Sequence, residues 1–294
     1  MSLVINHNLM AMNAARNLST TYTRLSTSVQ RLSSGLRINS AADDAAGLAI
    51  REMMRADIRV LNQGVRNAND ALSMIQTADG ALSVIDEKLT RMKELAEQAA
   101  TGTYTSAQRL IMDSEYQAMA SEITRIANAT DFNGVHLLDG SLSGSGVDGS
   151  AGNQMKIHFG TGNSSAEDYY YIKINSSTAS ALGVGNSIAV GTAGYTISTQ
   201  SAAQVALEAI DTAINSKDNI RADLGGLANR LSNTITNLTI QAENLQAAES
   251  RISDVDIATE MTEYTRNMIL TQAAVAMLAQ ANSLPSMALS LLGG

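Results

Sequence analysis

Apolar residues recur in steps of three and four along most of this 294-residue chain. At both ends this pattern is typical of a helix that packs along a partner helix. The front pattern consists of Leu18, Tyr22, Leu25, Val29, Leu32 and Leu36. The back pattern consists of Ile257, Met261, Tyr264, Met268, Val275 and Leu278, with Thr271 as a polar interruption. We expect these two end segments to pack against each other.

Two long helices and one shorter helix are predicted between the ends. The first runs from Met54 to Ala99, roughly 70 Å at 1.5 Å per residue, and Gly102 ends it. The shorter helix carries Met112, Tyr116, Met119, Ile123 and Ile126. The last carries Ile220, Leu224, Leu227, Leu231, Leu238, Leu245, Ile252 and Val255. Because these apolar faces have no other visible partner, we expect the helices to bundle together.

The helical pattern stops at Asp139, after which Gly, Ser and Asn dominate. Residues 154–159 and 169–174 alternate apolar and polar positions, and residues 187–190 and 195–197 flank a glycine-containing turn, so two small hairpins are predicted. Gly144, Gly146 and Gly149 have the GxGxxG spacing. No predicted strand precedes them and no helix follows, which favours a flexible loop over a dinucleotide site.

The predicted fold is therefore mainly α-helical: a long antiparallel helical bundle, or coiled coil, formed by both chain ends, with a small β-hairpin insertion. We expect two domains. The inner one is discontinuous and consists of the terminal helices, residues 1–42 plus 256–294. The outer one is a helical bundle, residues 43–255, that contains the insertion at about 141–200.

Charge is distributed unevenly along the chain. Residues 1–15 and 267–294 contain no charged side chain, and the net charge of −8 argues against nucleic-acid binding. The front helix has unopposed arginines, whereas acidic residues outnumber basic ones at the start of the back helix. The arginines are Arg16, Arg24, Arg31 and Arg37, and the acids are Asp254, Asp256, Glu260 and Glu263. The two ends should attract each other, although an exposed ion pair contributes only ~0.2–1 kcal/mol.

A membrane-spanning helix needs about 20 predominantly apolar residues. The longest strictly apolar run near the C-terminus is only residues 273–279, and the flanking Gln272 and Gln280 would be unsatisfied in lipid. We therefore expect no membrane insertion, and the N-terminus lacks the features of a secretory signal peptide. The chain has no cysteine, which excludes thiolate catalysis, cysteine metal sites and disulfides.

Residues that could carry catalysis are few. His7, His136 and His158 are isolated in the sequence, so a metal site would need distant ligands, and no HExxH motif occurs. Asp43 and Asp44 are adjacent, but they also precede a predicted helix, where capping is the better explanation. We expect a protein without catalytic, cofactor-binding or metal-binding residues.

Several longer motifs resemble those of bacterial flagellins. SSGLRINS at 33–40 and AADDAAG at 41–47, followed by LAI, resemble the flagellin N-terminal signature. GVRNANDAL at 64–72, RMKELA at 91–96, DFNGVHLL at 131–138 and a tail at 275–292 with LAQAN and LSLL resemble others. The resemblance covers about 230 residues at both ends. Large outer domains of the kind found in many flagellins are missing, which indicates a short form.

This resemblance implies a structural subunit that polymerises into the bacterial flagellar filament for swimming motility. It implies unfolded export by the flagellar type III system, an extracellular filament, a chaperone at the C-terminal arm (about Met261 to Leu292), and cap and hook-junction proteins as neighbours. Isolated helices are marginal in water, so the arms would fold on assembly. The expected polymerisation residues are Leu18, Leu25, Val29, Leu32, Met261, Met268, Val275, Leu278, Leu289, Leu291 and Leu292.

Two other functions remain open at this point, a hook–filament junction protein and a generic helical-bundle adaptor. Junction proteins share similar terminal arms but match the internal motifs less well. The flagellin resemblance also implies recognition by a vertebrate Toll-like receptor through Arg91, Leu95 and Glu115. Arg91 and Leu95 are four residues apart on one predicted helix, so they would share a face, with Leu95 as an apolar anchor.

Overall fold

The computed structural model describes residues 7–144, 154–165, 167–185 and 196–292. Within the last helix the side chains of residues 284–286 and 288–292 are outside this description. The chain divides into two compact units: unit 1 is Met1–Ile58 with Glu243–Gly294, and unit 2 is Arg59–Ala242. The mainly helical fold expected from the sequence is confirmed. The domain boundaries expected near residues 42 and 256 stay a prediction.

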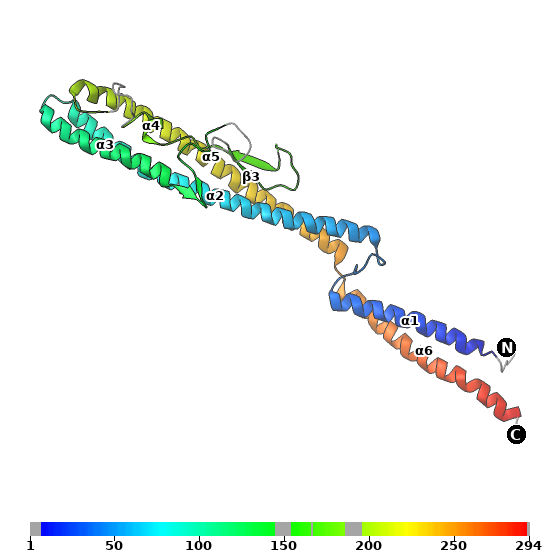
Figure 1. The fold of residues 1–294 in the computed structure, drawn as a ribbon. Coiled ribbons are helices and arrows are strands. Elements are labelled where there is room, and N and C mark those ends of the chain that lie inside the picture. Colours follow the sequence, from blue (N-terminus) through cyan, green and yellow to red (C-terminus); the bar gives the residue numbers. More distant parts are fainter. Residues whose placement is uncertain (1–6, 145–153, 166, 186–195, 293–294) are drawn as a thin grey trace. The chain divides into compact units, whose positions relative to one another are not determined.

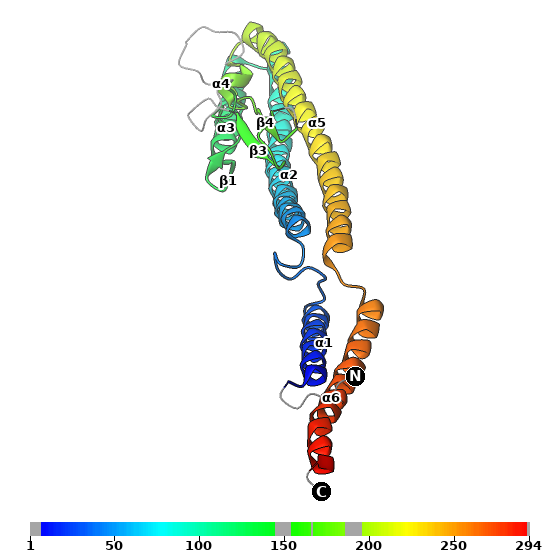
Figure 2. The same ribbon diagram turned by 90° about the vertical axis from the view of Figure 1, so that its right-hand side faces the viewer.

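Unit 1 contains an antiparallel helix pair, α1 (Leu9–Ser34) and α6 (Ile257–Leu292), whose ribbons run side by side in Figures 1 and 2. Asn8 caps α1 by accepting a hydrogen bond from the backbone N–H of Ala11, and its side-chain amide donates to the Ala281 carbonyl at 2.7 Å. At the other end of the pair, Arg31 lies 3.5 Å from Glu260. The end segments therefore pack together as expected.

A short antiparallel bridge joins the two halves of unit 1 next to the helix pair. Gly35 ends α1 in the left-handed conformation, at φ 74°, which a glycine adopts without strain. Its carbonyl accepts from the Val255 N–H at 3.0 Å, and the Arg37 N–H donates to the Ser253 carbonyl at 2.7 Å. These bonds hold the segment that follows α1 against the segment that precedes α6.

The two adjacent aspartates stabilise the start of α2 (Ala45–Ala100). Asp44 precedes the helix and accepts from the Gly47 N–H at 2.9 Å, so the capping role expected for it is confirmed. Asp43 accepts from the N–H and the hydroxyl of Ser40, and these bonds keep the pKa of Asp43 below its ordinary value. Both carboxylates are bound within the turn that begins the helix.

Unit 2 has its core between α2, α3 (Ser106–Ala129) and α5 (Gln200–Ser253) (Figure 2). The guanidinium of Arg109 on α3 donates to the carbonyls of Ala99 and Thr101, which satisfies the C-terminal end of α2. The helix ends at Ala100, close to the expected Gly102. Buried aliphatic residues of the core include Leu82, Ile85, Leu89, Met92, Ile123, Ile210, Leu224 and Leu231. Helix α5 begins twenty residues before the first apolar position from which it was predicted.

Two small hairpins and a short helix, α4 (Ala179–Leu182), complete the part of unit 2 that the structure describes. Strand β3 (Met155–His158) pairs antiparallel with β4 (Tyr169–Ile172), which confirms the first expected hairpin. The second expected hairpin, at 187–197, lies almost wholly outside the described residues, as do Gly146 and Gly149. An additional hairpin joins β1 (Asp131–Phe132) to β2 (Val135–His136) through Asn133 and Gly134, both at positive φ.

The β3–β4 hairpin is attached to two helices at once. A Cβ on Gly64 of α2 would collide with the backbone of Phe159, so a glycine is required for this close approach, and Asn67 donates to the His158 carbonyl at 2.9 Å. The ring of Tyr170 packs 4.8 Å from that of Phe159 and lies under the guanidinium of Arg230 on α5, at 4.3 Å. Docking of the hairpin thus depends on how α2 and α5 are aligned.

Candidate interaction surface

The seam between α1 and α6 is built from small, polar and only half-buried residues. Ser28 on α1 is 4% exposed, and Asn267 and Glu260 on α6 are 5% and 8% exposed. Half-buried residues complete the seam on both helices: Ala14, Leu18, Thr21, Leu25, Leu32, Tyr264, Met268, Thr271, Ala274 and Leu278. A seam of this composition buries little apolar surface and stabilises the pair weakly.

The expected front pattern is corrected at two of its six positions. Leu18, Leu25 and Leu32 face α6, but Tyr22 and Val29 are 64% and 48% exposed. The reason is geometric, because one partner helix covers a single narrow line of side chains. The line that is covered contains Thr21 and Ser28.

The back pattern likewise divides into positions covered by α1 and exposed positions. Met268 and Leu278 lie half-buried in the seam, whereas Met261 and Val275 are 46% and 52% exposed. The side chains of Leu289, Leu291 and Leu292 lie outside the described residues. Further large apolar side chains are exposed on both helices: Leu9, Met10, Met12, Ile257, Ile269, Leu270 and Met277. We call these, together with Tyr22, Val29, Met261 and Val275, the outer face of the α1–α6 pair.

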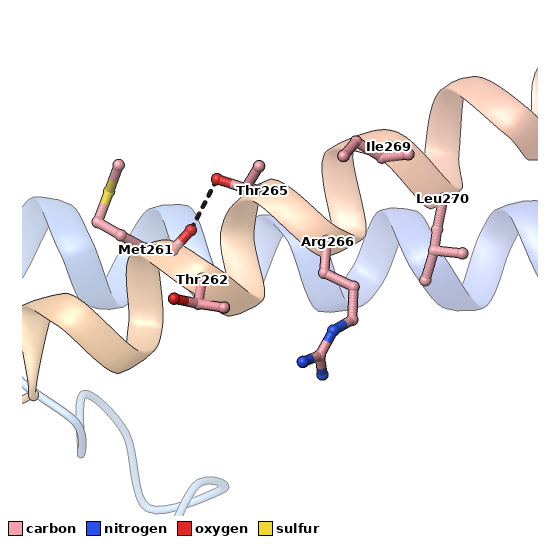
Figure 3. A pocket seen from close by; sticks show the side chains of 6 residues that line it. All are labelled: Met261, Thr262, Thr265, Arg266, Ile269 and Leu270. Atoms are coloured by element: carbon pink, nitrogen blue, oxygen red, sulfur yellow. Dashed lines mark hydrogen bonds between the residues drawn. The ribbon is translucent and has the colours of Figure 1, made fainter.

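Part of the outer face forms an open hollow along α6 (Figure 3). It is lined by Met261, Thr262, Thr265, Arg266, Ile269 and Leu270. The Thr265 hydroxyl donates to the Met261 carbonyl and is thereby satisfied within the helix, and Arg266 pairs with Glu263 at 2.6 Å. The Thr262 hydroxyl likewise donates to the Ala258 carbonyl. With both threonines and the arginine engaged in these contacts, the methionine, isoleucine and leucine side chains remain as the contact groups of this hollow.

Burial contrasts sharply between the two units. Among the described side chains of unit 1, only Ile38 and Ala281 are fully buried apolar residues, and the large hydrophobic core lies entirely within unit 2. Ile38 is held by Arg51, which donates to its carbonyl at 2.7 Å. A large exposed apolar surface marks an interaction site, so the outer face of unit 1 is the strongest candidate in the described chain.

Electrostatic contacts support the helix pair without dominating it. Arg31 and Glu260 form the one ion pair described between α1 and α6, as the opposite charges of the two ends predicted, and the Arg31 side chain is still 32% exposed. Asp256 caps α6 by accepting from the N–H groups of Ala258 and Thr259 and from the Thr259 hydroxyl. The hydrogen bonds from Thr259 lower the pKa of Asp256, and the bond from its hydroxyl has the larger effect.

The three residues expected to form a receptor patch do not share one exposed surface. The Arg91 guanidinium contacts the Glu115 carboxylate at 2.9 Å, and these side chains are 49% and 42% exposed. Leu95, in contrast, is 2% exposed and belongs to the core. The expectation that Leu95 is an exposed anchor is therefore wrong, because its position on α2 lies in the line of residues facing the bundle.

Side chains for chemistry are sparse in the described ranges. No group of three or more His, Asp or Glu residues there could hold a metal ion, and none of the helices in those ranges has the length and hydropathy to cross a membrane. His7 and His136 are exposed, and a ring nitrogen of His158 lies 2.9 Å from the Gly162 carbonyl. The apolar outer face of the α1–α6 pair is therefore the most prominent feature of the described residues that a partner could contact.

Comparison with known proteins gives the family. Residues 5–143 match the bacterial flagellin N-terminal helical region, and residues 207–292 match the bacterial flagellin C-terminal helical region. Flagellin FlaB1 of Treponema pallidum is 42% identical over 290 residues, which cover 99% of this chain and 100% of that protein. The flagellin of Bacillus subtilis is 44% identical, covering 98% and 99%.

The chain belongs to the bacterial flagellin family. It is a short flagellin, a structural subunit of the flagellar filament that serves swimming motility. The near-complete coverage of both chains in these comparisons supports the short form, since these relatives are of similar length.

Proposed function

We propose that the outer face of α1 and α6 is the surface through which copies of this chain polymerise. The observation that carries the proposal is the placement of the apolar residues. The fully buried seam positions of α6 include the polar Glu260 and Asn267, whereas Ile269 and Met277 on its outer face are 57% and 63% exposed. An exposed apolar surface of this kind marks an interaction site, and neighbouring copies would cover it.

The energy available from this surface is of the same order as the cost of association. Full burial of a large aliphatic side chain contributes ~1.5–3 kcal/mol, so completing the burial of a half-exposed one contributes on the order of 1 kcal/mol. The outer face offers about ten such side chains. Their sum is comparable with the ~4–15 kcal/mol that association costs in lost freedom of motion.

The weak seam also couples folding of the terminal helices to assembly. A helix pair held by few buried apolar groups is only marginally stable alone, so the arms order fully when neighbours cover them. This property suits transport of the unfolded chain through the flagellar type III exporter to an extracellular filament. We also propose, from the family resemblance, a chaperone over about Met261 to Leu292 before export, where exposed apolar side chains such as Met261 and Met277 need cover, and cap and hook-junction proteins at the filament ends.

Seeded polymerisation tests the proposal. The double variant Ile269→Gln/Met277→Gln makes the outer face polar and leaves the seam intact, so it should fail to elongate filament seeds. The matched control Ile269→Leu/Met277→Leu keeps the face apolar and should elongate them. Thermal unfolding of unit 2 should be the same in both variants. If the glutamine variant elongates at the wild-type critical concentration, the outer face is not part of the contact between subunits in the polymer.

We further propose that the Arg91–Glu115 pair contributes to recognition of the depolymerised subunit by a vertebrate Toll-like receptor. The support consists of the family resemblance and the exposure of both side chains. Leu95 would contribute only indirectly, because it packs α2 against the core.

A further inference from the structure

One lysine interrupts the apolar line along which α5 packs in unit 2. The line advances in steps of three and four, and Lys217 occupies the position between Ala213 and Ile220. Its side chain is 2% exposed, as deeply buried as its apolar neighbours. The buried residues of this line are Ala203, Ala206, Ile210, Ala213, Lys217, Ile220, Leu224 and Leu231.

The buried ammonium group is bound by two carboxylates. Lys217 Nζ lies 2.5 Å from Asp86 on α2 and 2.8 Å from Asp218 on its own helix. The two aspartates are 39% and 59% exposed, so the cation is buried while its counter-ions reach solvent. A buried charge is tolerated only when it is paired, and pairing with Asp86 is possible at one alignment of α5 along α2.

Two further ion pairs join the same helices on either side of Lys217. Arg221 contacts Asp79 at 2.7 Å, and Lys93 contacts Asp211 at 2.5 Å. The α2 members, at 79, 86 and 93, are spaced by seven residues, and their signs run negative, negative, positive. The α5 partners run positive, positive, negative in the matching order.

This order of signs opposes displacement of the helices by one heptad. The apolar line repeats every seven residues and contains many alanines, so packing alone distinguishes poorly between neighbouring alignments. A displacement in one direction brings Asp86 toward Asp211. A displacement in the other direction brings Lys93 toward Lys217. Each wrong alignment therefore places like charges together. In the first, Asp79 would replace Asp86 beside Lys217, but Asp86 would face Asp211 and the partners of Arg221 and Lys93 would be lost. In the second, Asp86 would face Arg221, and the buried Lys217 would face Lys93 in place of a carboxylate.

We propose that Lys217, with its two flanking ion pairs, is a register pin that selects one alignment of α2 and α5. A single buried polar residue in a helical seam is known to specify register at a cost in stability. The alignment matters because the β3–β4 hairpin must meet Gly64 on α2 and Arg230 on α5 together. A displaced pair would leave one of these two contacts unmade.

A distance measured between α2 and α5 in the full-length protein tests the register pin. Since the sequence contains no cysteine, spin labels can be attached at Ser73→Cys on α2 and Thr212→Cys on α5, which are both exposed. A one-heptad displacement moves the labels by roughly 10 Å along the helix axis, from 1.5 Å per residue. With Lys217 present we expect one distance between the labels.

The decisive variant is Lys217→Met, which replaces the buried charge by an apolar side chain of similar length. We expect retained helicity, a thermal midpoint no lower than that of the parent, and a second distance population displaced by roughly 10 Å. The matched control is Lys173→Met, which replaces an exposed lysine that belongs to none of these three ion pairs and should keep one distance.

Two results would overturn the register pin. The first is a single, unshifted distance in Lys217→Met, which would mean that packing alone selects the alignment. The second is loss of helicity in Lys217→Met while Lys217→Arg folds with the parental distance, which would make the lysine a stabilising contact and not a selector of register.

Discussion

Truncation of a core leucine gives the most direct test of how unit 2 is held together. Leu82 on α2 and Leu231 on α5 are both 0% exposed and lie in the same core. Replacing either by alanine removes buried methylene and methyl groups and leaves a cavity, at a cost of ~2–5 kcal/mol in the free energy of unfolding. The matched control is Val84→Ala, because Val84 is on the same helix as Leu82 but is 42% exposed.

The expected change is large enough for calorimetry of the full-length monomer. For a unit of this size each kcal/mol lowers the unfolding midpoint by ~2–4 °C, so each leucine variant should unfold roughly 4–20 °C below the parent. The surface control should stay within about 2 °C. Midpoints of Leu82→Ala and Leu231→Ala that match the control would mean that these positions are not in a cooperative core.

Two further predictions concern charged side chains. The pKa of Asp168 is lowered because the Ser164 and Gly162 N–H groups donate to its carboxylate. These bonds therefore stabilise the loop before β4 at pH values above the ordinary aspartate pKa. The loop loses that stability as the pH falls through the folded-state pKa of Asp168. Amide NMR of Gly162 should follow this acid transition, and Asp168→Asn should abolish it. Arg91→Ala should weaken receptor activation by the depolymerised protein. Its thermal midpoint should be unchanged, because the exposed Arg91–Glu115 pair contributes little to the stability of the fold. If the Arg91→Ala/Glu115→Ala variant activates the receptor as strongly as the parent, this pair is not part of the receptor contact.

The helices could be predicted from the sequence because aliphatic residues at steps of three and four continue over many turns. The start of α5 was missed for a physical reason that the structure explains. Between residues 200 and 219 the line consists mainly of alanines, and Lys217 occupies a core position. Neither a small residue nor a lysine signals burial by itself, and only the facing Asp86 makes the lysine an interior residue.

The register of the terminal helices could not be obtained from their own sequences. Leu18 and Leu25 belong to two adjacent lines of residues, one through Tyr22 and Val29 and the other through Thr21 and Ser28. The apolar line is the better choice for a helix in isolation. The structure places the polar line against α6 and leaves Tyr22 and Val29 of the apolar line exposed.

The β1–β2 hairpin carries a turn signal in the sequence, but its strands are too short to be predicted. Asn133–Gly134 is the dipeptide preferred in two-residue hairpin turns, and both residues have positive φ. The strands it joins are two residues long each. Alternation of apolar and polar residues cannot be recognised over so short a length.

The polarity of the α1–α6 seam leads to a final prediction about the timing of assembly. Asn267 is 5% exposed within the seam, so Asn267→Leu would add apolar burial between α1 and α6 where the parent has a buried amide. The free subunit should then show more helix by circular dichroism, and it should polymerise without seeds after a shorter lag. Gln272→Leu is the control, because it adds the same side chain at an exposed position of α6 and should not raise helicity in the free subunit. If Asn267→Leu increases helicity but leaves the lag unchanged, folding of the arms does not limit nucleation, and the weak seam has no role in delaying assembly.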